Sequence, residues 1–215
     1  YDPEKDLGTG HEDGNQWVPP EADVSIRPGW FYHEDEDQKV KTPEELLDLY
    51  YKSVGRGTNL LLNLPPDKRG LISEPDVTNL LEFRKKLNNI FDKNVITHDT
   101  RVKASNVRHE SKHFSADNVL TDDFDSYWAT DDGVNQAELE LEFPQAVTFN
   151  HIVLQENIKL GQRIKSWDIK VKTEKGWEKV KSGTTIGYKR ILPVKTVTGK
   201  KLMFKIKEAK ACPVI

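Results

Sequence analysis

Residues 17–33 read Trp-Val-Pro-Pro-Glu-Ala-Asp-Val-Ser-Ile-Arg-Pro-Gly-Trp-Phe-Tyr-His. Successive side chains of a β-strand point to opposite faces, so Ala22, Val24 and Ile26 form an apolar row opposite a row of polar side chains. A proline–glycine turn and a cluster of aromatic residues follow this strand. A strand that only filled a core would not carry polar residues at every second position, so the pattern favours one wall of a ligand-binding cleft.

The segments that follow predict a helix, a strand and a second helix. Residues 42–45 form a complete capping box with proline at the first helical position. Residues 59–64 are a nearly continuous apolar run, typical of a strand buried on both faces of a parallel sheet. A second capping signal at Ser73 precedes an apolar stripe over residues 77–91. This order fits the last part of a (β/α) barrel or a piece of a doubly wound sheet, and it is too short to close either fold alone.

The pattern changes near Val95 to short alternating segments separated by turn residues. Residues 137–143 alternate strictly between apolar and polar side chains, and the same theme returns at residues 151–155, 166–172 and 202–207. Segments of this kind are typical of an antiparallel β-sandwich. We therefore expect two domains, covering residues 1–94 and 95–215.

Composition and charge restrict the classes of partner. The chain has 215 residues and a formal net charge of −3, so no bulk positive field would hold it on nucleic acid or on an acidic membrane. It contains no run of about 18 apolar residues that would suggest membrane insertion. Cys212 is its only cysteine, which excludes an internal disulfide and a thiolate-rich metal site. A neutral partner such as a glycan fits these properties better, and we expect both ends to be internal to a longer protein.

The opening strand carries two carboxylates beside aromatic residues. On an extended strand, Glu21 and Asp23 place their carboxylates on one face, about 7 Å apart. Paired carboxylates next to aromatic rings suit glycoside hydrolysis, because glycosidases use two carboxyl groups and sugar faces stack on such rings. The alternative is that Asp23 forms a structural ion pair with Arg27. A straight strand would hold Glu21 more than about 17 Å from Trp30, so we expect either a bend at residues 28–29 or a short strand.

A second candidate site lies in an oxygen-rich loop at residues 116–128. This loop concentrates Asp, Asn, Ser and Thr side chains, which are the hard ligands that Ca²⁺ prefers. The alternative is an Asp-rich turn without a metal. Zinc is not expected, because His109 and His113 are four residues apart in a segment without a predicted helix.

These residues resemble two known families. Residues 17–33 and 53–66 are similar to the end of the catalytic barrel of α-L-fucosidases of glycoside hydrolase family 29, in the version that prefers α-1,3/1,4-linked fucose. Residues 103–215 resemble a discoidin-like (factor V/VIII type C) β-sandwich, a galactose-binding-like jelly roll that is also used as a family 32 carbohydrate-binding module. The resemblance implies a multidomain fold in which the C-terminal portion of a (β/α) barrel precedes an antiparallel β-sandwich.

The resemblance also implies an activity and a set of site residues. The family is exo-acting and retaining: an Asp nucleophile, expected upstream of residue 1, attacks the sugar while a Glu protonates the leaving oxygen. This chain alone is therefore expected to be inactive. Glu21 is implied either as this general acid/base or as a substrate contact, and both roles remain open. Trp30 resembles the aromatic residue of the fucose pocket, with Arg27, His33 and Trp17 as further substrate contacts.

The implied partner is a fucosylated oligosaccharide or glycoconjugate. No cofactor is required, although Asp123 and Ser126 match positions of a structural Ca²⁺ site in the sandwich family. The substrate class implies that the parent protein is periplasmic or extracellular. The alternative function is a non-catalytic carbohydrate-binding or structural sandwich attached to an inert barrel remnant.

Overall fold

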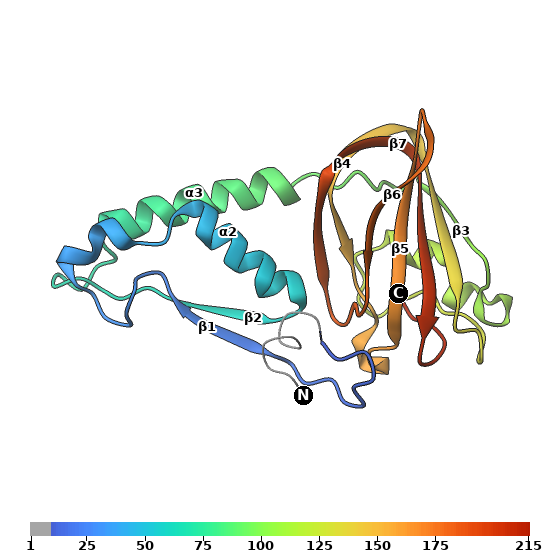
Figure 1. Ribbon diagram of the computed structural model, residues 1–215, viewed down its shortest axis with the longest axis horizontal. Coiled ribbons are helices and arrows are strands. Elements are labelled where there is room, and N and C mark those ends of the chain that lie inside the picture. Colours follow the sequence, from blue (N-terminus) through green and yellow to red (C-terminus); the bar gives the residue numbers. More distant parts are fainter. Residues whose placement is uncertain (1–9) are drawn as a thin grey trace. The chain divides into compact units, whose positions relative to one another are not determined.

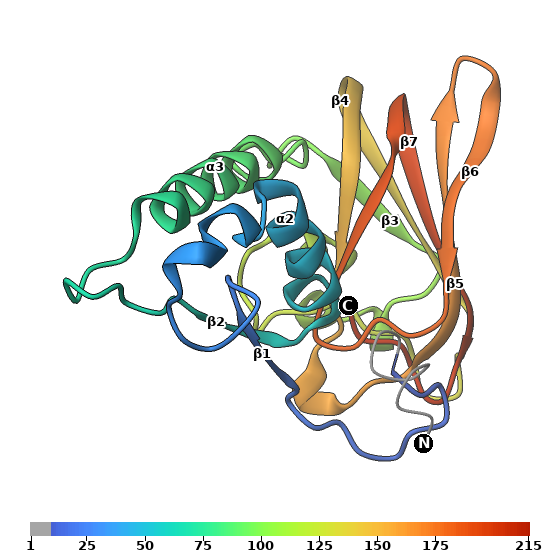
Figure 2. The same cartoon turned by 60° about the vertical axis from the view of Figure 1, so that its left-hand side comes forward.

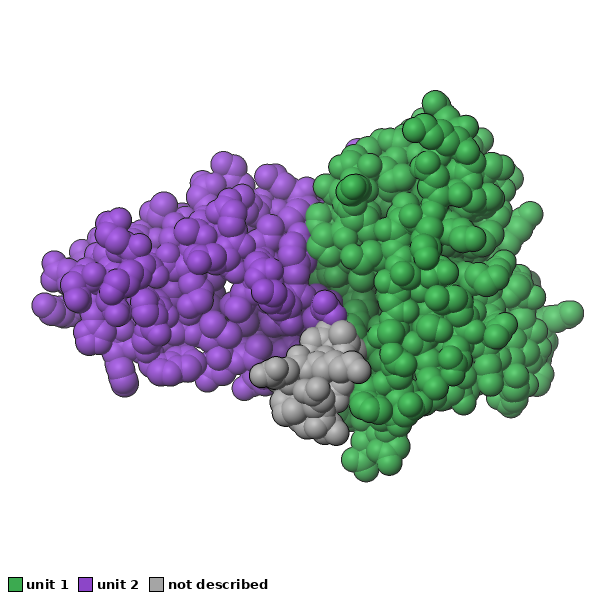
Figure 3. All heavy atoms as spheres, viewed as in Figure 1, with its two compact units in different colours: residues 1–18, 95–215 green, residues 19–94 purple. Residues whose placement is uncertain are grey.

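The computed structural model describes residues 10–215, which form two compact units. One unit comprises Pro19–Asn94, and the other comprises Val95–Ile215 together with the segment that ends at Val18 (Figure 3). The predicted barrel portion covers residues 1–94. Within the described residues, the segment 10–18 instead packs on the sandwich unit.

Specific contacts hold this N-terminal segment on the sandwich. The Gln162 side-chain amide donates to the main-chain carbonyl of His11 at 3.2 Å. The Lys165 ammonium pairs with the Asp13 carboxylate at 3.0 Å. We refer to residues 10–18 as the N-terminal strap.

The unit Pro19–Asn94 has the predicted order of strand, helix, strand and helix. Its main elements are β1 (Glu21–Ser25), α2 (Pro43–Lys52), β2 (Asn59–Asn63) and α3 (Glu74–Phe91) (Figure 1). The two strands pair in parallel, with Glu21 opposite Asn59 and Ser25 opposite Asn63. Parallel strands joined through a helix are the repeating unit of a (β/α) barrel, so this unit agrees with the predicted barrel portion.

The two helices begin in different ways. At α2, the main-chain N–H of Glu45 donates to the Thr42 hydroxyl and that of Thr42 donates to the Glu45 carboxylate, which confirms the predicted capping box. At α3, Ser73 occupies the N-cap position, but its side chain makes no capping bond. Its hydroxyl instead accepts a hydrogen bond from Arg27 at 2.7 Å. The capping signal therefore predicted where α3 begins, but not the partner of its serine.

The core of this unit is small. It comprises three buried side chains, Ile26, Val40 and Leu46, with Leu62, Leu64, Leu80 and Phe83 packed around them. The prediction that β2 is buried on both faces is not met within this two-stranded sheet, because Leu61 is 51% exposed. Burial on both faces requires layers on both sides of the sheet.

The sandwich unit contains a five-stranded antiparallel sheet. Its strands are β3 (Arg101–Ala104), β4 (Ala137–Leu154), β5 (Ile164–Thr173), β6 (Gly176–Gly183) and β7 (Arg190–Ala209), in the order β3-β4-β7-β5-β6 (Figure 2). Short 3-10 turns at residues 108–120 and 158–160 connect them, together with irregular loops. The predicted change from helices to antiparallel strands is thus confirmed.

Alternating side chains build the core of the sandwich. Leu139, Leu141 and Phe143 of β4 face inward with Trp167, Ile169 and Val171 of β5, and all six are less than 9% exposed. Trp128 is fully buried and its indole N–H donates to the carbonyl of Asn106 at 2.9 Å. Gly183 is required beside Trp167, because an added Cβ would lie 2.4 Å from the indole ring. The core is therefore closely packed, and its loops are anchored to it.

Candidate functional site

The chain bends back immediately beyond the carboxyl end of β1. The side-chain amide of Asn63, at the end of β2, donates both to the Ser25 hydroxyl at 3.1 Å and to the main-chain carbonyl of Trp30 at 3.0 Å. One side chain thus ties the strand end to the following loop. This arrangement confirms the predicted bend, and it leaves the Trp30 side chain 50% exposed.

Arg27 lies beneath this loop and is fully buried. Its Nη1 donates to the carbonyl of His33 at 3.0 Å, and its guanidinium carbon lies 4.6 Å from the centre of the Tyr32 ring. Nε and Nη2 donate to both carboxylate oxygens of Asp76, at 3.1 and 2.8 Å. Nη2 also contacts the Asp37 carboxylate at 2.7 Å. The guanidinium therefore joins the loop at residues 30–33 to the first turn of α3.

These contacts correct two predictions about Arg27. The proposed ion pair with Asp23 is wrong, because the carboxylate partners of Arg27 are Asp37 and Asp76 and the Asp23 residue is exposed. A direct contact with substrate does not fit a side chain that is buried and turned toward protein groups. Burial alone would lower the pKa of Arg27, but its hydrogen bonds to Asp76 and Asp37 raise that pKa above its ordinary value. Arg27 is thus a permanently charged residue that positions its neighbours.

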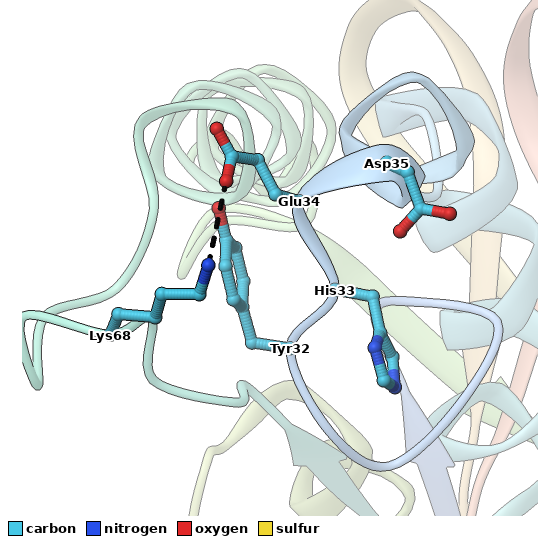
Figure 4. Close-up of a pocket in the computed structure, with 5 residues that line it drawn as sticks. All are labelled: Tyr32, His33, Glu34, Asp35 and Lys68. Atoms are coloured by element: carbon cyan, nitrogen blue, oxygen red, sulfur yellow. Dashed lines mark ion pairs between the residues drawn. The ribbon is translucent and has the colours of Figure 1, made fainter.

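Tyr32 and His33 line an open depression of about 540 Å³ together with Glu34, Asp35 and Lys68. Figure 4 shows the ion pair between Lys68 and Glu34, whose charged atoms are 3.8 Å apart, on one side of this depression and His33 on the other. Burial, together with the Asp37 and Glu34 carboxylates, raises the pKa of the Tyr32 hydroxyl. Tyr32 therefore stays a neutral hydrogen-bonding group at physiological pH, beside an exposed imidazole.

Glu21 lies apart from this loop. It is the first residue of β1, and its carboxylate accepts a hydrogen bond from the Asn59 amide at 3.4 Å. The five-residue strand separates it from the loop by about 13 Å along the strand axis. In (β/α) barrels the active site forms at the carboxyl ends of the strands. The loop at residues 30–33 is on that side of the sheet, whereas Glu21 is at the amino end.

Trp17 belongs to the N-terminal strap. Its ring centre lies 6.4 Å from that of Tyr188, at an angle of 46°. Both residues are in the sandwich unit, and both are a little more than one third exposed. The structure therefore gives Trp17 an aromatic partner that is remote in sequence from residues 21–33.

The candidate calcium loop is held together by its own side chains. The Ser126 hydroxyl donates to the Asp123 carboxylate at 2.9 Å, and the main-chain N–H of Asp125 donates to its other oxygen at 3.0 Å. These two bonds hold the pKa of Asp123 below its usual value. Lys159 forms an ion pair with Asp125. Across residues 10–215, no group of three or more His, Cys, Asp or Glu side chains is arranged to hold a metal ion. The bonds of Asp123 thus brace the loop.

Sequence reasoning missed three residues that organise the site: Asp37, Asn63 and Asp76. Asp37 lies in an acidic run that resembled a solvated surface, and Asp76 was part of the capping signal. No spacing rule connects Arg27 to a residue 49 positions away. The available signal was the placement of Asn63 at the end of a predicted strand, where parallel strands bring polar residues together.

The two units match different protein families. The F5/8 type C domain model matches residues 101–212. Since this match takes in more than half of the chain, the chain belongs to the F5/8 type C domain family. Residues 4–90 match the α-L-fucosidase family model. These matches confirm the resemblance to α-L-fucosidases and to the F5/8 type C sandwich. The resemblance to the version that prefers α-1,3/1,4-linked fucose stays a prediction.

Similar proteins of known name point in the same direction. Alpha-L-fucosidase 1 of Arabidopsis thaliana is 44% identical over 206 residues, which cover 94% of this chain and 40% of the relative. A Ruminococcus gnavus GH29 fucosidase, solved in complex with fucose, is 32% identical with a TM-score of 0.86, over 96% of this chain and 41% of that chain. A glycoside hydrolase 29 family member from an unknown rumen bacterium is 32% identical with a TM-score of 0.73, over 95% of this chain and 33% of that chain. The chain thus spans about two fifths of the length of the curated relatives it matches.

None of the helices in the described part of the chain is long and apolar enough to cross a membrane.

Proposed function

We propose that the protein containing this chain is an exo-acting α-L-fucosidase, and that the chain supplies the last part of its catalytic barrel and the adjoining sandwich. The family match over residues 4–90 and the named relatives support this assignment. The structural observation that carries it is the loop at residues 30–33. This loop presents an exposed indole and an imidazole at the carboxyl end of β1, where barrel enzymes bind their substrates.

Trp30, His33 and Arg27 have different roles in the proposal. Trp30 offers a half-exposed ring on which the apolar face of a fucosyl unit can stack. The exposed imidazole of His33 hydrogen-bonds to a sugar hydroxyl. Arg27 acts through these residues, since it binds the His33 carbonyl and lies against the Tyr32 ring. It is a positioning residue and makes no contact with the sugar.

The proposed reaction is retaining hydrolysis. An Asp nucleophile from a part of the parent protein outside residues 1–215 attacks the anomeric carbon, and a carboxylic acid protonates the departing oxygen. The resulting fucosyl-enzyme ester is then hydrolysed by water that the same carboxylate deprotonates. The position of Glu21 at the amino end of β1 favours an acid/base residue elsewhere in the parent protein. On this proposal the present chain binds and shapes part of the pocket and does not turn over substrate alone.

The proposed substrate is a fucosylated oligosaccharide or glycoconjugate with a terminal α-L-fucosyl unit. The solved complex of the Ruminococcus gnavus fucosidase with fucose supports this substrate class. Glycans of this type are displayed outside the cytoplasm, so we place the parent protein in the periplasm or the extracellular space.

The test is an assay of the parent protein on an aryl α-L-fucoside and on a branched fucosylated glycan. We expect release of fucose from both, with the α-anomer formed first in an NMR time course, and no turnover by residues 1–215 alone. Initial formation of the β-anomer would contradict retention. Absence of fucose release from every fucoside would contradict the proposed activity and leave the binding or structural alternative for the sandwich.

A further inference from the structure

The outward face of the five-stranded sheet carries paired charges on the neighbouring strands β4 and β7. Lys201 of β7 contacts two carboxylates of β4, Glu140 at 2.8 Å and Glu142 at 3.3 Å. In the same way, Lys205 pairs with Glu138 at 2.6 Å. Acidic and basic side chains thus alternate across β4 and β7, and the pairing neutralises this part of the face.

This pairing stops at the hairpin of β5 and β6. In the strand register, Lys170 lies directly opposite Lys179, and Lys172 lies directly opposite Trp177. Residues opposite each other in an antiparallel pair share a face, and so do residues two apart along a strand. The four side chains therefore form one square on the outward face, which we call the Lys–Trp patch. Within the described residues, none of its three lysines forms an ion pair.

The carboxylates near the hairpin do not neutralise the patch. Asp168 shares the outward face but pairs with Lys207 at 3.3 Å. Glu178 is opposite Val171, whose side chain is buried on the other face, and Glu174 lies in the turn. Residues 170–181 contain five lysines and two glutamates, a formal charge of +3 in a chain whose net charge is −3. Figure 2 shows this hairpin, in orange, at the outer edge of the sheet.

The arrangement is unfavourable for the isolated fold. Like charges placed directly opposite each other destabilise a strand pair. Lysines on an edge strand do prevent aggregation, which would account for Lys179. Edge protection does not account for the neighbouring Trp177, a large apolar residue on the same strand that is 39% exposed. A ligand that is both anionic and able to stack on an indole would satisfy both features.

We propose that the Lys–Trp patch binds an anionic polysaccharide, such as a polymer of uronic acid. The indole of Trp177 stacks on the apolar face of one sugar ring. The lysines are spaced about 7 Å apart along β5 and about 5 Å apart across the hairpin, so they meet carboxylates of neighbouring sugar units. This site lies on the sheet face and is separate from the loop at residues 30–33. It would hold the protein on an acidic matrix whether or not the fucosidase proposal is correct.

Affinity electrophoresis and calorimetry of the 215-residue chain would test the proposal. The ligands are polygalacturonate and its fully methyl-esterified form, which is the same polymer without charge. We expect binding to polygalacturonate that weakens with added salt and is lost on esterification. The double variant Lys170→Gln/Lys179→Gln and the variant Trp177→Ala should each lose about tenfold in affinity, equivalent to about 1.4 kcal/mol.

The matched control is Lys112→Gln/Lys195→Gln, which removes the same charge from two exposed lysines of the same unit outside the patch. It should bind polygalacturonate like the wild type, and near-ultraviolet circular dichroism should show that all variants are folded. An equal loss of affinity in the control would show that binding depends on net charge and not on the patch, and it would overturn the proposal. Failure of the wild type to bind polygalacturonate would also overturn it, as would patch-dependent binding only to duplex DNA or to acidic phospholipid vesicles.

Discussion

The guanidinium of Arg27 and the carboxylate of Asp76 form an ion pair in which neither side chain is exposed to solvent. The two residues are 49 positions apart and are joined by two hydrogen bonds, so they connect the end of β1 to the start of α3. A buried pair of this kind contributes little net stability by comparison with apolar residues, but the loss of one partner leaves an uncompensated charge. The pair therefore makes the fold of this unit sensitive to either residue.

The substitution Asp76→Asn should lower the free energy of unfolding by about 3–5 kcal/mol, because it leaves Arg27 buried with the partly exposed Asp37 as its remaining carboxylate partner. Urea unfolding followed by tryptophan fluorescence would measure the change. The control is Asp48→Asn, which breaks an exposed pair with Lys52 and should cost less than about 1 kcal/mol. Equal effects of the two substitutions would contradict the role given to the buried pair.

Glu156 should give the sandwich an unusual pH dependence. The residue is 3% exposed, and burial raises the pKa of its carboxyl above the ordinary value of 4.5, although hydrogen bonds from three main-chain N–H groups act in the opposite direction. The folded state thus holds this proton more tightly than the unfolded chain does. The resulting stabilisation is complete below about pH 4.5 and is lost as the pH rises through the folded-state pKa.

The measurement is the difference in unfolding free energy between the wild type and Glu156→Gln, followed by urea titrations from pH 4 to pH 8. As the pH rises, the wild type should lose unfolding free energy relative to Glu156→Gln, because glutamine does not ionise. A difference that stays constant would show that the three main-chain donors offset burial, and a difference that grows in favour of the wild type would show that they outweigh it.

The substitution Trp30→Ala in the parent enzyme should lower kcat/KM by about tenfold, mainly by raising KM, because it removes a stacking surface worth about 1.4 kcal/mol. Steady-state kinetics on an aryl α-L-fucoside would measure it. The control is Phe124→Ala, an aromatic residue of the sandwich that is 64% exposed. Equal values of kcat/KM for the two variants would show that Trp30 does not contact the sugar.

The substitution Glu21→Gln should leave kcat/KM of the parent enzyme within about threefold of the wild type, since Glu21 lies at the amino end of β1. Removal of a general acid/base typically costs a factor of about 10² to 10⁴ instead. A loss of that size, with a change in the pH profile of kcat, would show that Glu21 is the general acid/base, the role that the sequence left open.

Calcium should not raise the melting temperature of this chain. Asp123 is already bonded to Ser126 and to the main chain of Asp125, whose carboxylate pairs with Lys159. Thermal unfolding in calcium chloride and in a chelator would test this expectation. A rise in melting temperature that grows with calcium concentration and disappears in Asp123→Ala would establish the predicted metal site, because a ligand that binds only the folded state raises stability by mass action.

Local signals in the sequence predicted local structure well. The capping box at residues 42–45 and the alternation at residues 137–143 depend on near neighbours, and both gave the expected helix and strand. The bend after β1 followed from proline and glycine at residues 28–29. The family resemblance predicted the two-part architecture that these local signals alone left open.

Long-range partners could not be predicted in the same way. Arg27 has carboxylates at several sequence distances, and only the packing of α3 on the core around Ile26 places Asp76 in contact with it. Similarly, residues 10–18 have no periodicity, and their attachment to the sandwich depends on Gln162 and Lys165. Such contacts arise from the assembled fold and are not encoded in residue spacing.

The N-terminal strap has a consequence for how the protein can be divided. Because the strap belongs to the sandwich unit, the polypeptide passes between the two units twice, at Val18–Pro19 and at Asn94–Val95. A protease that cuts only the second junction leaves the sandwich in two pieces, one of them still covalently attached to the α/β unit. A sandwich expressed from Val95 onward would lack the strap and would expose the surface around Tyr188 that Trp17 covers. The two units are therefore separate in their packing but interleaved in their covalent order.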